Sequence, residues 1–188
     1  MTASVMENPA RDDAACLSAV LSCGAFQAGV IAAGEIEVRQ DVRAACESNV
    51  CRNYGRTWAC PPASGTLDEC RARIRQYRSL LLYSCKYPLE DSFDYEGMMS
   101  AWRSFKALSD RVRETVSGEI AGCLFLSNEG CGRCEVCTYP DAPCRHPDKM
   151  QPSIEGWGLL VADLAKRAGM RYINGKNTVT YFGGILMP

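Results

Sequence analysis

Residues 171–187, RYINGKNTVTYFGGILM, predict how the chain ends and which kind of sheet it builds. Asn174 and Gly175 form a strong two-residue turn signal between two runs of strand-forming residues, which is the pattern of a β-hairpin. The two arms of a hairpin are antiparallel. We therefore expect the chain to close with a C-terminal β-hairpin that adds antiparallel pairing to its sheet.

Upstream of this hairpin, segments with helical and strand-like patterns alternate, as in a layered α/β fold. A capping box of Thr66 and Glu69 predicts one of the helix starts. With the antiparallel hairpin added, the sheet should be mixed, and the fold class is a single-domain α/β fold over residues 1–188. The expected strands are 25–32, 79–87 and 120–126, and the expected helices are 13–22, 41–47, 67–77, 93–116 and 153–169.

Composition narrows the class of protein. The 188 residues are 47% hydrophobic, which is enough for a real core without disulfide staples. A net charge of −1 argues against a nucleic-acid partner. The N-terminus has no basic region followed by an apolar one, and the longest apolar stretch, 28–33, is far shorter than a membrane span. We expect a soluble, cytoplasmic protein with no membrane partner.

The chain has twelve cysteines, a smaller share than the roughly 8–10% that marks small secreted disulfide scaffolds. In the cytosol, reduced thiols are more often metal ligands than disulfide partners. Five of the cysteines fall on apolar helix faces, at helix ends or within strands, where cysteine packs as a small hydrophobe. These five are Cys16, Cys23, Cys70, Cys85 and Cys123.

Four further cysteines lie in GCGRCEVCTYPDAPCRHP, residues 130–147, within a loop expected over 130–152. The overlapping C-x2-C-x2-C run wraps three thiolates around a body larger than one ion, as in bacterial ferredoxins, and a fourth cysteine follows a proline-bearing gap that is longer than theirs. Zinc ribbons normally use separate C-x2-C pairs. We predict a [4Fe-4S] cluster on Cys131, Cys134, Cys137 and Cys144, with zinc or a disulfide knot as the alternatives.

Basic residues near this quartet fit an anionic cluster. Arg133, Arg145 and Lys149 are placed to offset the negative charge of four thiolates and their cluster. Ordinary solvated loop charges would look the same in the sequence. His146, the only histidine, is a candidate ligand or outer donor.

The other cysteine loop, over 46–65, contains only three candidate ligands, Cys46, Cys51 and Cys60. Three thiolates can hold a second cluster whose remaining iron is open to a small molecule, or a cysteine of the other loop can cross over. One cluster plus a zinc ion, or an empty reduced triad, also accounts for the count. Arg52 and Arg56 again supply positive charge.

Four segments carry a resemblance to a known family. They are CESNVCRNYGRTWACPPASG, LLYSCKYPLEDSFDYEGM, GCGRCEVCTYPDAPCRHPDKMQPSIEGWG and YINGKNTVTYFG, in that order. Together they resemble the family of predicted metal-binding proteins catalogued as a domain of unknown function, over nearly the whole chain after the first helix. The resemblance implies metal binding by the triad and the quartet, and brings no activity with it.

Two functional hypotheses follow. In the first, the protein holds one or two [4Fe-4S] clusters and works in redox chemistry with a redox partner, or binds a small molecule, such as a sulfur-containing substrate, at an open iron. In the second, zinc only holds the loops of a binding module without catalysis. The overlapping cysteine run favours the first.

Overall fold

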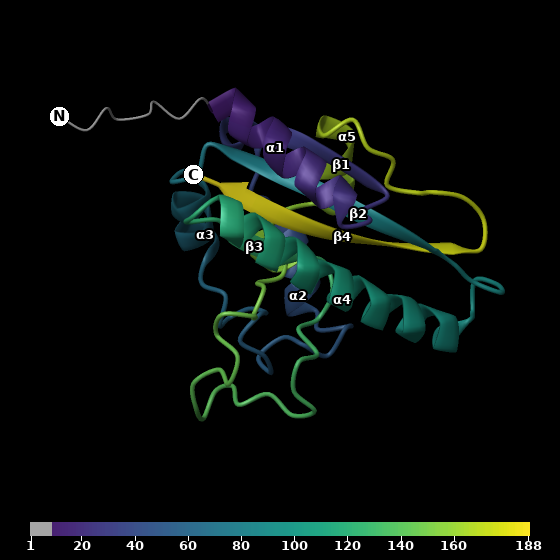
Figure 1. Cartoon of the computed structure of the whole chain (residues 1–188). Coiled ribbons are helices and arrows are strands. Elements are labelled where there is room, and N and C mark those ends of the chain that lie inside the picture. The colour runs from purple at the N-terminus through teal and green to yellow at the C-terminus, as the bar shows by residue number, and fades with distance from the viewer. Residues whose placement is uncertain (1–8) are drawn as a thin grey trace.

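The computed structural model describes residues 9–188 and places the C-terminal strand inside the sheet. Every pair of neighbouring strands in the four-stranded sheet is antiparallel, in the order β1-β2-β4-β3 (Figure 1). The strands are β1 (Gln27–Ala32), β2 (Ser79–Pro88), β3 (Leu124–Ser127) and β4 (Thr178–Met187).

The α/β fold class is confirmed, but the expectation of a mixed sheet is wrong. Strands β2 and β3 run in the same direction, since both are antiparallel to β4. The 25-residue helix α4 (Tyr95–Glu119) connects them as a crossover. Because β4 lies between them, the two strands do not pair with each other, and no parallel pair forms among the named strands.

The predicted C-terminal hairpin forms only its second arm. Strand β4 begins at Thr178, and the preceding segment contains no strand. Its backbone bonds a side chain of β1 instead, because the amide nitrogen of Arg171 donates to Oε1 of Gln27 at 2.9 Å. Nε2 of Gln27 donates to Oδ1 of Asn174 at 3.2 Å. The expected turn residue is therefore held against β1.

Helices cover both faces of the sheet, which divides the core in two. Side chains of β2 alternate between the faces, with Leu80 and Leu82 in one cluster and Leu81 and Tyr83 in the other, as the period of a strand requires. Helices α1 (Pro9–Ser22) and α4 pack on the second face (Figure 1). Helices α3 (Leu67–Ile74) and α5 (Val161–Arg167) contribute to the first.

The helix expected over 153–169 is interrupted. A short 3-10 helix, η2 (Glu155–Trp157), precedes α5. Gly158 between them has φ of 75°, and a Cβ there would lie 2.9 Å from the carbonyl oxygen of Arg39. A close backbone approach therefore ends the first helical piece.

Two long segments without helix or strand, 48–66 and 128–154, contain most of the candidate ligands. They extend from the same end of the molecule, below the sheet in Figure 1. The first follows α2 (Gln40–Glu47), which itself follows the short η1 (Ala33–Glu35). No helix in residues 9–188 is long and apolar enough to cross a membrane. Residues 1–8 of the predicted domain lie outside the described part of the chain.

Candidate metal centre

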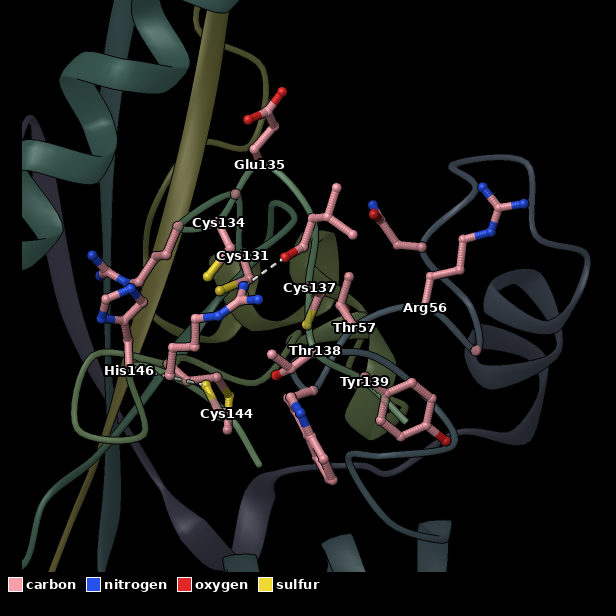
Figure 2. Close-up of a pocket in the computed structure, with 18 of the residues that line it drawn as sticks. Arg56, Thr57, Cys131, Cys134, Glu135, Cys137, Thr138, Tyr139, Cys144 and His146 are labelled. Atoms are coloured by element: carbon pink, nitrogen blue, oxygen red, sulfur yellow. Dashed lines mark hydrogen bonds between the residues drawn. The ribbon is translucent and has the colours of Figure 1, made fainter. Parts of the chain in front are cut away.

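The four cysteines of the quartet line one cavity of about 510 Å³. Figure 2 shows Cys131, Cys134, Cys137 and Cys144 arranged around this space. The wall contains more positive than negative side chains, which suits an anionic occupant. Its positively charged residues are Arg52, Arg56, Arg133 and Arg145, and its negatively charged residue is Glu135.

Arg133 fixes the start of the quartet to helix α4. Its guanidinium donates to both carboxylate oxygens of Asp110, at 3.1 and 2.5 Å, and its Nε donates to the carbonyl oxygen of Lys149 at 2.7 Å. Burial opposes ionisation of Asp110, but the hydrogen bonds and charge of Arg133 hold the pKa of this carboxyl below its ordinary value. Arg133 is therefore partly neutralised, and Lys149 is not among the residues that line the cavity.

A closed turn returns the fourth cysteine to the other three. Oγ1 of Thr138 donates to the carbonyl oxygen of Pro143 at 2.8 Å, and the amide of Ala142 donates to the carbonyl oxygen of Thr138 at 2.9 Å. Beyond the turn, Nη1 of Arg145 donates to the carbonyl oxygen of Val136 at 2.9 Å. Val136 lies between two cysteines of the run, so this bond joins the two arms of the quartet.

A backbone donor also reaches one sulfur atom of the quartet. The amide nitrogen of His146 donates to Sγ of Cys144 at 3.4 Å. Such N–H···S bonds stabilise a thiolate and tune the potential of a cluster that it ligates. The side chain of His146 lies in the cavity wall (Figure 2).

Gly132 is a residue whose role the sequence analysis missed. It lies between Cys131 and Arg133 with φ of 56°, and a Cβ there would be 2.2 Å from the ring of Trp102 on α4. Only glycine lets the first knuckle approach the helix so closely. A glycine directly after the first cysteine of the run was the available signal.

The triad lines a second cavity, of about 440 Å³. Cys46 is in the last turn of α2 and therefore lies within a helix, at the border of the predicted loop. Cys60 is buried and Cys51 is exposed. The wall also includes Tyr54 and two carboxylates, Glu129 and Glu155.

Two thiols of the triad, Cys46 and Cys60, have raised pKa values. Burial raises the pKa of Cys46 to about 11, with further contributions from Glu155, Cys51 and Cys60. Burial likewise raises the pKa of Cys60, and Cys51 and Cys131 add to the effect. A cation in this cavity would stabilise the thiolates, because metal binding deprotonates a thiol.

The two cavities adjoin each other. Asn53 contributes to both walls. Cys131 of the quartet is near enough to Cys60 of the triad to affect its pKa. In residues 9–188, no group of three Cys, His, Asp or Glu side chains is arranged to hold a single metal ion. The seven candidate cysteines instead line the two neighbouring cavities.

The polar residues of the second cavity were also missed from the sequence. Glu129 precedes the quartet by two positions, and Glu155 lies well beyond it, so neither forms a motif with the triad. Arg43, one turn before Cys46, is buried and donates to the carbonyl oxygens of Gly65, at 2.6 Å, and of Gly156. The only sign of Arg43 in the sequence was its position three residues before Cys46 in a predicted helix.

The five cysteines assigned to packing lie in or against the hydrophobic clusters. Cys16, Cys70 and Cys85 are buried, while Cys23 and Cys123 are partly buried at the edge of one cluster. Burial raises the pKa of Cys16 to about 12 and that of Cys123 to about 11. Neutral, packed thiols are the expected state of structural cysteines.

Comparison with known proteins gives one match. The model of a family described as "Predicted metal-binding protein (DUF2284)" matches residues 29–187. No curated protein and no solved structure matches the chain. The matched range includes both cavities.

Proposed function

Since the chain belongs to the DUF2284 family of predicted metal-binding proteins, we propose that it holds iron–sulfur clusters in its two cysteine-lined cavities. The proposed cofactor is a [4Fe-4S] cluster on Cys131, Cys134, Cys137 and Cys144, and a second cluster on Cys46, Cys51 and Cys60. The protein would act in the cytoplasm in redox or small-molecule chemistry.

One observation carries this proposal: the seven loop cysteines divide between two cavities as four and three. None of the five cysteines packed in the core lines either cavity. Cavities of about 510 and 440 Å³ have room for a body of several atoms, whereas one tetrahedral zinc ion would draw its ligands in to Zn–S bonds of about 2.3 Å. The quartet supplies four thiolates to the first cavity, the ligand set of [4Fe-4S] clusters.

The surroundings of the quartet also fit an anionic cluster. Arg52, Arg56 and Arg145 line the cavity, and Arg145 is anchored beside Cys144 through its bond to the carbonyl oxygen of Val136. Cationic side chains and N–H donors near the sulfurs stabilise the reduced, more negative state of a cluster. We infer that the quartet would serve electron transfer or structure.

The triad would be the working site. Three thiolates leave one iron without a cysteine, and such an iron supplies Lewis-acid chemistry when the cluster is bound. The chain's own residues line that position, with Val42, Ala45 and Leu160 offering apolar contacts and Asn128 and Ser153 offering polar ones. This wall fits a small molecule with one donor atom, such as a thiol.

The test is anaerobic reconstitution followed by iron and sulfide analysis, visible absorbance and paramagnetic resonance of the reduced protein. We expect brown protein with two clusters. Cys134→Ser should lose the quartet cluster alone and Cys60→Ser the triad cluster alone. Cys85→Ser, a buried core cysteine, is the matched control and should keep the full complement.

Other outcomes would point elsewhere. Colourless protein with stoichiometric zinc would replace the proposal with a zinc-stabilised binding module. Full iron and sulfide in Cys134→Ser would overturn the quartet assignment. A triad cluster whose spectrum is indifferent to added thiol or cyanide would leave only electron transfer or structure.

A further inference from the structure

The triad cavity contains a carboxylate that its three cysteines do not explain. Glu155 is part of η2, immediately beyond the second cysteine segment, and lines the cavity with Cys46, Cys51 and Cys60. Burial is the main reason that the pKa values of Cys46 and Cys60 are raised, and the nearby carboxyl of Glu155 adds a smaller contribution to each. A metal site in this cavity would be adjacent to it.

The backbone around Glu155 is fastened to the element that holds Cys46. Arg43 lies one helical turn before Cys46 on α2, and its buried guanidinium donates to the carbonyl oxygen of Gly156, the residue after Glu155. A second nitrogen donates to the carbonyl oxygen of Gly65 at 2.6 Å. One buried side chain therefore sets the distance between α2 and η2.

The same backbone is fastened to the segment that holds Cys60. The amide of Ser153 donates to the carbonyl oxygen of Ala59 at 2.8 Å. A Cβ on Gly156 would lie 3.0 Å from Cδ of Pro61, so the two chains pack directly on each other. Glu155 is thus positioned relative to both neighbouring cysteines by contacts that do not involve its own side chain.

The carboxyl of Glu155 is weakly satisfied by protein donors. Oγ of Ser153 donates to its Oε2 at 3.5 Å, the outer limit of a hydrogen bond. Burial, with a smaller contribution from Glu129, raises the pKa of Glu155 to about 7. A bound cation would provide the partner that the protein does not.

Glu129 independently indicates a positively charged or metal-bearing occupant. Its Oε1 accepts from Nζ of Lys106 and from Oγ of Ser127, both at 2.7 Å. Its Oε2 is buried and has no hydrogen-bond partner among the described residues, and its side chain is only 7% exposed. A buried carboxylate oxygen without a partner is costly unless something in the cavity satisfies it.

We propose that Glu155 supplies the non-cysteine ligand to the metal site of Cys46, Cys51 and Cys60, an inference that rests on the proposed function. Glu129 is anchored through Oε1 by Lys106 and Ser127, whereas the side chain of Glu155 has only the long bond from Ser153 and can turn toward the cysteines. A carboxylate is a harder and more exchangeable ligand for iron than a thiolate. Glu155 would therefore occupy the fourth position at rest and give way to a small thiol or anion.

The experiment compares reconstituted wild type with Glu155→Gln and Glu155→Ala. Each protein is titrated anaerobically with ferricyanide while paramagnetic resonance follows the appearance of a three-iron cluster. We expect the variants to lose the fourth iron about 10- to 100-fold more readily, the range for disrupted metal-site residues. They should also bind added cyanide at lower concentration, because the position is no longer occupied.

One comparison and one control accompany this test. Glu129→Gln changes the other acid of the same cavity and distinguishes the two candidates for the non-cysteine ligand, and Glu135→Gln changes an acid in the wall of the quartet cavity. Glu135→Gln is the control and should keep the fourth iron as wild type does. Circular dichroism and thermal unfolding check folding, and Glu155→Gln preserves the side-chain volume if Glu155→Ala does not fold.

The failure of this inference differs from that of the proposed function. If wild type binds two clusters and Glu155→Gln behaves as wild type, Glu155 is not a ligand. If Glu129→Gln alone frees the iron, the ligand is Glu129 and the inference is overturned. If wild type takes up no iron and sulfide at the triad, the proposed function fails and the inference fails with it.

Discussion

The indole Nε1 of Trp58 donates a hydrogen bond to the carbonyl oxygen of Ala142 at 3.1 Å. The ring of Trp58 also meets the ring of Tyr139 edge-on, with centroids 5.0 Å apart. Trp58 belongs to the first cysteine segment, and both partners belong to the turn that returns Cys144 to the quartet. The two candidate metal sites are therefore mechanically coupled.

Trp58→Phe should loosen this coupling. Phenylalanine keeps an aromatic edge for Tyr139 but loses the donor, and the partner carbonyl is exposed enough for water to replace it, so the cost should not exceed about 1 kcal/mol. Hydrogen exchange should accelerate for amides of residues 138–145, with little change in the sheet. Tyr95→Phe, at an exposed tyrosine that begins α4, is the control. Unchanged exchange in the turn would contradict the coupling.

Arg43→Lys should weaken the attachment of α2, which contains Cys46, to η2, which contains Glu155. Lysine keeps the charge but cannot reach both carbonyl oxygens, and losing charge-assisted hydrogen bonds at a buried site costs about 2–3 kcal/mol. Denaturant unfolding measures this loss, and iron analysis should show a weakened triad cluster with the quartet cluster intact. Arg71→Lys, on the neighbouring helix and more exposed, should change neither quantity much.

Arg133→Ala should lower stability by about 2 kcal/mol near neutral pH, because it leaves the partly buried carboxylate of Asp110 without its main partner. The pKa of Asp110 is depressed in the folded protein. Its stabilising contribution is thus present above the ordinary carboxyl pKa and is lost as pH falls through the depressed value.

The difference between wild type and Arg133→Ala should therefore shrink in acid. Urea unfolding at a series of pH values measures it. Arg167→Ala, at the exposed end of α5, serves as control and should give no such trend. A difference that stays constant down to strongly acidic pH would contradict the role given to the ion pair.

Gly183→Ala tests the register of the sheet. A Cβ at this position would lie 2.2 Å from Cζ of Tyr83, which is paired with Gly183 across β2 and β4. Tyr83 is fully buried and its hydroxyl bonds Oγ of Ser109 at 3.0 Å, so the ring has no room to move. Overpacking should cost about 2–3 kcal/mol in denaturant unfolding. Gly34→Ala, with nothing within 4 Å, is the control.

The sequence predicted the local elements better than their assembly. Thr66 and Glu69 form the capping box, with both reciprocal bonds present. The run of apolar residues in β2 was correctly read as a buried strand, because burial on both faces needs an unbroken apolar pattern. The insertion of β4 between β2 and β3 could not be predicted, since hydrophobic periodicity defines faces and not neighbours.

The same limit applies to the candidate site. The spacing of the cysteines in the sequence predicted the quartet and the triad, because residues close in sequence lie close in space. Glu155 and Arg43 are far from each other and from Cys60 in sequence, and only the packing of η2 on α2 unites them. The hairpin at Asn174 and Gly175 does not form for a related reason: the side chain of Gln27, distant in sequence, bonds the backbone of Arg171 and the side chain of Asn174, and the first arm does not pair as a strand.

Gly132→Ala should remove the quartet cluster selectively. The new Cβ would meet the ring of Trp102 at 2.2 Å, and φ of 56° disfavours any residue with a side chain. The first knuckle must then move away from α4, which displaces Cys131 and Cys134 relative to the other two ligands. Metal sites tolerate displacements of only about 0.2 Å in ligand distance.

Gly55→Ala is the control that distinguishes the steric clash at Gly132 from the backbone strain of a positive φ. Gly55 has φ of 66°, close to that of Gly132, but a Cβ there would find nothing within 4 Å. Both variants pay a backbone cost of about 1 kcal/mol, and only Gly132→Ala also forces the knuckle from its place. Iron analysis should show the triad cluster in both proteins and the quartet cluster only in Gly55→Ala. Equal loss of the quartet iron in both would attribute the effect to strain and remove Trp102 from the explanation.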